Sequence, residues 1–159
     1  MRCEANKRGG APVGHLSELT GAEAASVIYL RLWCEGGSKR QGIHSDFASV
    51  FGNVRADHLN QTFGELCRLC VQHGRRPLMR HAVQCGCLGG DEACFANFVA
   101  YAAEGEREDA LLMATLMVRP DMAPLLTSLA TEVGLALKQM RLAAPSAPQR
   151  HTYQHATIH

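Results

Sequence analysis

The segment from about Arg55 to His73 constrains the fold most, because its apolar residues recur at helical spacing. They stand at positions i, i+4, i+7, i+8 and i+11, which is one continuous face of an α-helix: Leu59, Phe63, Leu66, Cys67 and Cys70. A long amphipathic helix must bury such a face against other elements. No segment shows the apolar–polar alternation of a half-buried strand, so these partners are predicted to be helices.

Start and stop signals indicate further helices on both sides of this segment. Thr20-Gly21-Ala22-Glu23 has the form of a capping box, and Gly36-Gly37 provides a stop. A glycine- and basic-rich loop is expected over 36–45. Other helices are expected at about 46–51, at 78–84, from a cap at Asp91 to Gly105, at 106–118, and after Asp121. The sequence therefore predicts an all-α, single-domain orthogonal bundle of about six helices.

The length of 159 residues suits one domain. Residues 1–15 are expected to be a flexible leader, because Gly9-Gly10-Ala11-Pro12 offers little to bury. Residues 16–142 form the predicted helical domain. Residues 143–159 are rich in Ala, Pro, Gln and His, and we expect a disordered tail there.

Charge and hydropathy narrow the partners and the compartment. The 16 basic and 15 acidic residues leave a net charge of +1, which gives no general reason to expect nucleic acid or an anionic membrane. No apolar run approaches the roughly 20 residues that span a bilayer, and the polar N-terminus lacks a signal peptide. We therefore expect a cytoplasmic protein, and its Ala-, Arg- and Gly-rich composition is typical of a bacterial source. The seven cysteines are an odd number, so reduced thiols are expected.

Five of the seven cysteines lie between Cys67 and Cys94, in two patterns. The first is Cys67-x-x-Cys70-x-x-His73, and the second is His81-x-x-x-Cys85-x-Cys87. Zinc takes four such ligands, and ligands one helical turn apart can share one metal ion. The sequence predicts zinc bound by His81, Cys85 and Cys87, completed by Cys67, Cys70 or His73. An Fe–S cluster is a less favoured cofactor.

Other interpretations of the cysteines stay open, because the spacing matches no standard zinc finger, ribbon or knuckle. Cys67 and Cys70 lie on the apolar face of their helix and can serve as core residues, as can Cys94. Cys85-x-Cys87 can act as a thiol switch whose pKa is lowered by nearby arginines.

The expected function depends on whether any catalytic motif accompanies these cysteines. The chain has no phosphate-binding glycine loop, nucleophile elbow or His-Glu-x-x-His motif. We therefore expect a non-enzymatic metal-binding protein with a regulatory or interaction role, whose partner is another protein or a second copy of the chain. The alternatives are a cysteine- or metal-dependent enzyme, for instance with His81 as base, and a helical scaffold without metal.

Overall fold

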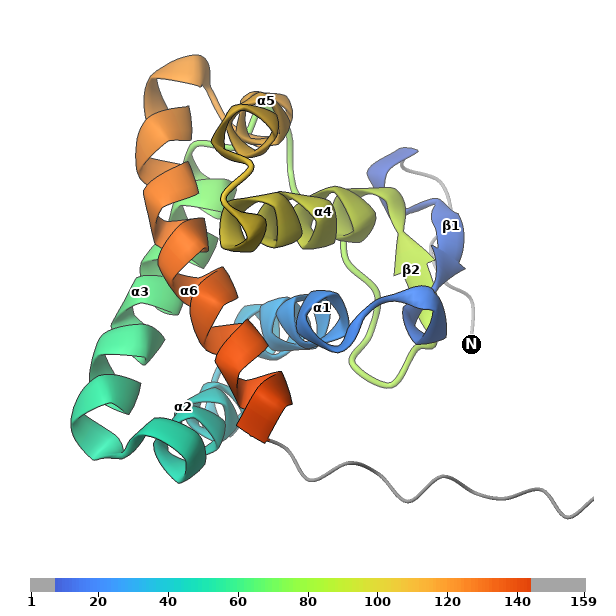
Figure 1. Ribbon diagram of the computed structural model, residues 1–159. Helices are drawn as coiled ribbons and strands as arrows, with labels where there is room; N and C mark the ends of the chain where they lie inside the picture. The colour runs from blue at the N-terminus through green and yellow to red at the C-terminus, as the bar shows by residue number, and fades with distance from the viewer. Residues whose placement is uncertain (1–7, 144–159) are drawn as a thin grey trace, which may run out of the picture.

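The computed structural model describes residues 8–143 and shows an all-α bundle within them (Figure 1). Six α-helices make up most of it: α1 (Gly21–Glu35), α2 (Ser38–Phe51), α3 (Asn53–Gln72), α4 (Gly90–Glu104), α5 (Arg107–Met117) and α6 (Ala123–Ala143). Three 3-10 turns accompany them: η1 (Arg8–Gly10), η2 (Leu16–Glu18) and η3 (Pro120–Met122). The predicted fold class is thus confirmed. The tail predicted over 143–159 lies, beyond Ala143, outside the described residues.

The predicted signals at both ends of α1 and at the C-terminal end of α4 are confirmed. The Thr20 hydroxyl accepts from the backbone N–H of Glu23, and the Glu23 carboxylate accepts from the N–H of Thr20, which completes the capping box. Gly36 ends α1 with a φ of 73°, and Gly105 ends α4 in the left-handed region with a φ of 80°. Both positions need a residue without a Cβ penalty at positive φ.

The core lies where α3, α4 and α6 meet and α1, α2 and α5 cover them. In Figure 1, α4 runs across α6 rather than along it. Gly134 of α6 allows these two helices to approach closely, because a Cβ there would stand 2.8 Å from the Cβ of Ala103 and 2.9 Å from the carbonyl oxygen of Val99. Phenylalanines of α3 and α4 and leucines of α6 fill the interior.

The prediction of a loop over residues 36–45 is wrong, because α2 begins at Ser38 and includes most of that segment. Gly37 precedes the helix with a φ of 58°, and Gly42 is an exposed residue inside it. Ile43 and Phe47, one turn apart, are both buried and dock α2 onto the core. This tertiary contact outweighs the weak helix propensity of the glycine.

The prediction of a helix over residues 78–84 is also wrong. In addition, the structure contains two short strands that were not predicted. Residues 78–84 have no helical structure, and β1 (Pro12–His15) pairs antiparallel with β2 (Cys87–Gly89). Residues 8–15, expected to belong to a flexible leader, therefore form η1 and β1. The physical reason is tertiary: side chains of α1 and α4 bind the backbone groups of residues 79–89 that a helix would use internally.

Two predictions about helix ends are also wrong: the N-cap of α4 and the conformation of the glycine that follows α3. Helix α4 begins at Gly90 with Gly89 as its cap, so Asp91 lies in the first turn and is not the N-cap. Gly74 follows α3 without a left-handed φ. Its missing Cβ matters instead because that atom would meet the carbonyl oxygen of Cys70 at 2.5 Å. Within residues 8–143 no helix has both the length and the apolar character to cross a bilayer.

Candidate thiol–imidazole site

A buried arginine holds the loop that carries the predicted ligands His81, Cys85 and Cys87. The Arg31 side chain of α1 is 0% exposed. Its two Nη atoms donate to the carbonyl oxygens of Ala82 at 3.1 Å, Cys85 at 2.7 Å and Cys87 at 2.7 Å. Its other N–H groups bind the Glu92 carboxylate at 2.7 and 2.8 Å. All five guanidinium donors are thereby used.

Glu92, in the first turn of α4, completes the arrangement from the opposite side. Besides Arg31, its carboxylate accepts the backbone N–H of His81 at 2.9 Å and that of Gly89 at 3.0 Å. Burial works to raise the pKa of Glu92, but the hydrogen bonds from Arg31, Gly89 and His81 and the charge of Arg31 together outweigh it. The net pKa lies below the usual value, so Glu92 is ionised at neutral pH.

His81 is held in one tautomer by the segment before β1. The imidazole is buried beneath Gly89, and its Nε2 lies 2.9 Å from the carbonyl oxygen of Gly10. Because a carbonyl only accepts hydrogen bonds, Nε2 carries the proton in the neutral ring and Nδ1 is the free acceptor. Nδ1 is therefore the atom available for a thiol or a metal ion.

Cys85 lies next to that nitrogen. Its Sγ stands 3.8 Å from His81 Nδ1, and its side chain is half-buried. The contact arises because the backbone turns after Ala82, whose carbonyl oxygen accepts from the N–H of Cys85 at 3.0 Å. The structure thus brings two of the predicted ligands together, although the helix expected to do so is absent.

Cys87 lies at the start of β2, and a residue that the sequence analysis missed stands opposite to it. In the register of the two strands His15 is the direct partner of Cys87. Opposed residues of an antiparallel pair have Cβ atoms about 4.5–5.5 Å apart. His15 could be recognised as a neighbour only once β1 was known to pair with β2.

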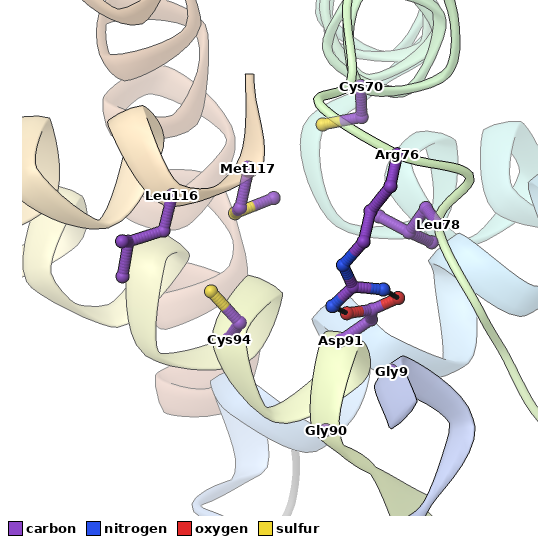
Figure 2. A pocket seen from close by; sticks show the side chains of 9 residues that line it. All are labelled: Gly9, Cys70, Arg76, Leu78, Gly90, Asp91, Cys94, Leu116 and Met117. Carbon is purple, nitrogen blue, oxygen red and sulfur yellow. Dashed lines mark hydrogen bonds and ion pairs between the residues drawn. The ribbon is translucent and has the colours of Figure 1, made fainter. Parts of the chain in front are cut away.

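A cavity lies beside the segment that follows α3, where Arg76 and Leu78 line it (Figure 2). Its volume is about 340 Å³, and α3, α4, α5, η1 and the segment after α3 contribute to its walls. Cys94, the last member of the predicted cluster, lines this cavity and not the His81–Cys85 pair.

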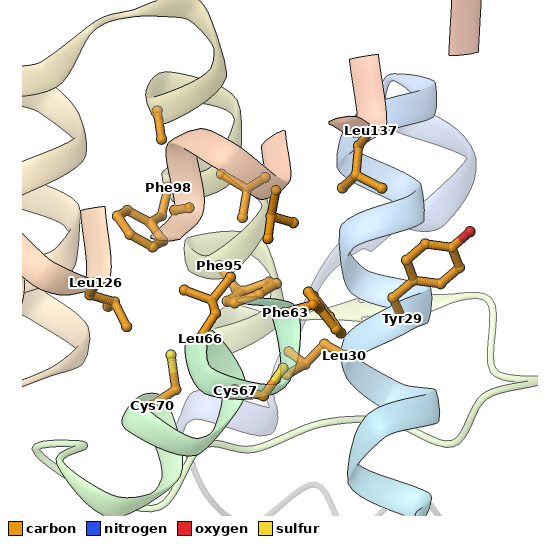
Figure 3. Close-up of a cluster of buried hydrophobic side chains, with 14 of the residues drawn as sticks. Tyr29, Leu30, Phe63, Leu66, Cys67, Cys70, Phe95, Phe98, Leu126 and Leu137 are labelled. Carbon is orange, nitrogen blue, oxygen red and sulfur yellow. The ribbon is translucent and has the colours of Figure 1, made fainter. Parts of the chain in front are cut away.

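Cys67 and Cys70 lie in the hydrophobic core, among Phe63, Leu66 and Phe95 (Figure 3). They are 0% and 3% exposed. Burial is the main cause that raises the pKa of Cys70 to about 12, helped by the nearby Cys34 and Cys94. Burial likewise raises the pKa of Cys67 well above its usual value. Both are protonated core thiols at neutral pH, which matches the core-packing interpretation of this pair.

Across residues 8–143, no three His, Cys, Asp or Glu side chains form a group that could hold a metal ion. The five predicted ligands are therefore separated into the His81–Cys85 pair, Cys87 on β2, and the core cysteines Cys67 and Cys70. Comparison of the chain with protein-family models, with curated proteins and with solved structures gives no match.

Proposed function

We propose that this protein is a small regulatory or interaction domain that binds zinc through His81, Cys85 and Cys87. The observation that supports it is the state of His81: Nδ1 faces the Cys85 thiol at 3.8 Å while Nε2 is bound to a backbone carbonyl. Histidines that ligate a metal usually donate their other N–H to such a group, which orients the ring and raises its basicity.

The separation of the two atoms fits two ligands of one ion. Zinc bound tetrahedrally, with Zn–N of about 2.1 Å and Zn–S of about 2.3 Å, places its nitrogen and sulfur ligands about 3.6 Å apart. Cys87 follows Cys85 by two residues, and His15 lies opposite Cys87. Binding would draw Cys87, with His15 as the fourth ligand, toward the pair, and the exposed Gly86 gives the chain freedom to turn there.

The proposed role agrees with the rest of the molecule. Zinc would tie β1, β2 and the loop together, so that metal supply controls the surface they form, and a partner protein or a second copy would recognise that surface. A reducing, cytoplasmic compartment keeps the thiols available for zinc.

Metal analysis of the untagged full chain tests the proposal. We expect one zinc per chain by elemental analysis, lost in His81→Ala and Cys85→Ser. Cys34→Ser is the matched control, because Cys34 is also half-buried but belongs to α1. Chains without stoichiometric zinc, in which all thiols react with a thiol reagent, would overturn the proposal.

The same contact favours a second candidate, a reactive Cys85 thiol with His81 as its base. Here Nδ1 would accept the thiol proton, and the resulting Cys85 thiolate would be the nucleophile. Alkylation rates distinguish the two candidates. A reactive thiol is alkylated faster in the metal-free wild type than in His81→Asn, whereas zinc binding makes the wild type the slower one once zinc is added.

A further inference from the structure

The cavity beside α5 has features that a ligand can use, and nothing in the proposed zinc site involves it. Its volume of about 340 Å³ lies at the lower end of the roughly 300–1,000 Å³ of small-molecule sites. Leu78 of the loop and Leu116 of α5 form apolar parts of its wall.

Three sulfur atoms distinguish the lining of this cavity. Cys70, Cys94 and Met117 come from three different helices, and Figure 2 shows their side chains around the same space. Thiol and thioether sulfur are polarisable, and they make favourable contacts with the edges of aromatic rings. Such a wall favours an aromatic ligand over a purely polar one.

The lining residues include one ion pair, Arg76 and Asp91, whose two charges neutralise each other. Both Nη atoms of Arg76 bind the Asp91 carboxylate, which also accepts the backbone N–H of Met79 at 2.7 Å. The bidentate contact holds the guanidinium plane beside the cavity (Figure 2). Since neither charge is left over, an anionic or cationic ligand would lose its hydration without gaining a counter-ion.

The two thiols add no charge at neutral pH. Burial raises the pKa of Cys70 to about 12. Burial also raises the pKa of Cys94, and the charge of Asp91 raises it further while Arg76 lowers it. The cavity is therefore neutral as a whole, and it selects against charged ligands.

The volume sets the size of the ligand. An apolar cavity of about 150 Å³ binds one benzene ring. A cavity of about 340 Å³ is somewhat more than twice as large, so it has room for two fused rings.

From wall chemistry, charge and size we infer that this cavity is a binding site for an uncharged, two-ring aromatic molecule. The ring edges would contact the sulfur atoms of Cys70, Cys94 and Met117. One ring face would lie against the Arg76 guanidinium, which stacks well on aromatic rings. Leu116, 62% exposed, would cover the outer edge of the ligand.

Titration calorimetry of the full chain with 2-naphthol tests this inference. We expect one saturable site with a dissociation constant below about 1 mM. The anionic 2-naphthalenesulfonate, with the same rings, is expected to bind at least ~10-fold more weakly. Equal affinity for the two compounds, or no saturable binding of 2-naphthol, would overturn the inference.

Two leucines of α5 provide a matched pair of variants. Leu116→Asp places a carboxylate on the cavity wall and should weaken 2-naphthol binding at least ~10-fold. Leu112→Asp, one turn earlier and also 62% exposed, lies outside the lining and should leave binding within about two-fold. Because both side chains are exposed, circular dichroism should show both variants folded. Equal binding by the two variants contradicts the site.

Thiol protection gives a measurement that needs no variant. Saturating 2-naphthol should slow alkylation of Cys94 by iodoacetamide several-fold, because the ligand covers its sulfur. Cys34 is half-buried like Cys94 but does not line the cavity, so its rate should not change. Equal protection of both thiols would exclude binding in this cavity. None of these readouts involves the His81–Cys85 pair, so they are independent of the proposed zinc site.

Discussion

Replacing Arg31 with methionine should destabilise the protein by about 3–5 kcal/mol at pH 7, because it leaves a buried carboxylate without its cation. The Glu92 side chain is 0% exposed and would keep only the N–H groups of His81 and Gly89. The three carbonyl groups that Arg31 binds belong to half-buried residues of the loop and can turn toward water, so they add less. A domain of this size is stable by about 5–15 kcal/mol, so the variant should fold with a much lower denaturation midpoint.

The double variant Arg31→Met/Glu92→Leu separates the charge from the packing. With both charges removed, α1 and α4 can pack through apolar side chains of similar volume. Its stability should lie between those of Arg31→Met and the wild type, because replacing a whole buried ion pair is often neutral but the buried N–H groups of His81 and Gly89 lose their acceptor. Urea unfolding followed by circular dichroism measures all the free energies required, with Glu92→Leu completing the double-mutant cycle.

The pH dependence supplies an independent test of the same reasoning. In the wild type the pKa of Glu92 is lowered, so its stabilisation is present above the unfolded pKa of about 4.3 and is lost as the pH falls through the folded value. In Arg31→Met only the N–H groups of His81 and Gly89 oppose burial, so the pKa of Glu92 rises relative to the wild type and the variant loses less stability as the pH falls. The stability difference between the two should therefore narrow from pH 7 to pH 4. A loss below about 1 kcal/mol in Arg31→Met, or a double variant as unstable as the single, would refute the argument.

Two further predictions concern packing and the core thiols. Gly134→Ala should destabilise by about 1–3 kcal/mol in urea unfolding, since its Cβ would meet α4 at 2.8 Å, whereas Gly42→Ala, on an open face of α2, should stabilise by about 0.5–1 kcal/mol. Equal effects of the two substitutions would show that close approach of α4 and α6 is unimportant. The raised pKa values of Cys67 and Cys70 mean that their contribution to stability is complete below the unfolded thiol pKa of about 8.5 and is lost as the pH rises toward their folded values. Unfolding free energies of the wild type and Cys70→Ala should therefore converge between pH 8 and pH 11, and parallel curves would contradict this.

The helices could be predicted where local signals decide them. The Thr20–Glu23 capping box and the stops at Gly36 and Gly105 act between residues close in sequence, so a single sequence reveals them. Helix α2 was missed because Gly42 and the basic residues resemble a loop, and only the burial of Ile43 and Phe47 against the core shows otherwise. The prediction of a helix over residues 78–84 was wrong for the opposite reason. Their local pattern favours a helix, but contacts from α1 and α4 bind their backbone groups and prevent one.

The candidate site was predictable only in part. The spacing of His81 and Cys85 predicted correctly that these two residues lie together. The reason given, one turn of a helix over residues 78–84, was wrong. Arg31 lies one turn after Val27 on the buried face of α1, and an arginine on such a face indicates a buried charge that needs an acidic partner. Glu92 stands three residues after Gly89, which has the spacing of a capping box. Neither signal predicts that Arg31 pairs with Glu92, because this pairing depends on how α1 and α4 pack.

Two consecutive carboxylates in the first turn of α4 organise the loop that borders both candidate sites. Asp91 accepts the N–H of Met79, and Glu92 accepts the N–H of His81. These donors are two residues apart, as suits an extended chain, while the carboxylates are adjacent on a helix. Each carboxylate also binds an arginine, Arg76 beside the cavity and Arg31 beneath the thiols. The Arg76–Asp91 pair is partly exposed, whereas the Arg31–Glu92 pair is fully buried, so that removing one partner of the buried pair leaves an uncompensated charge. Breaking the contact of Arg76 is therefore expected to cost less stability than breaking the contact of Arg31.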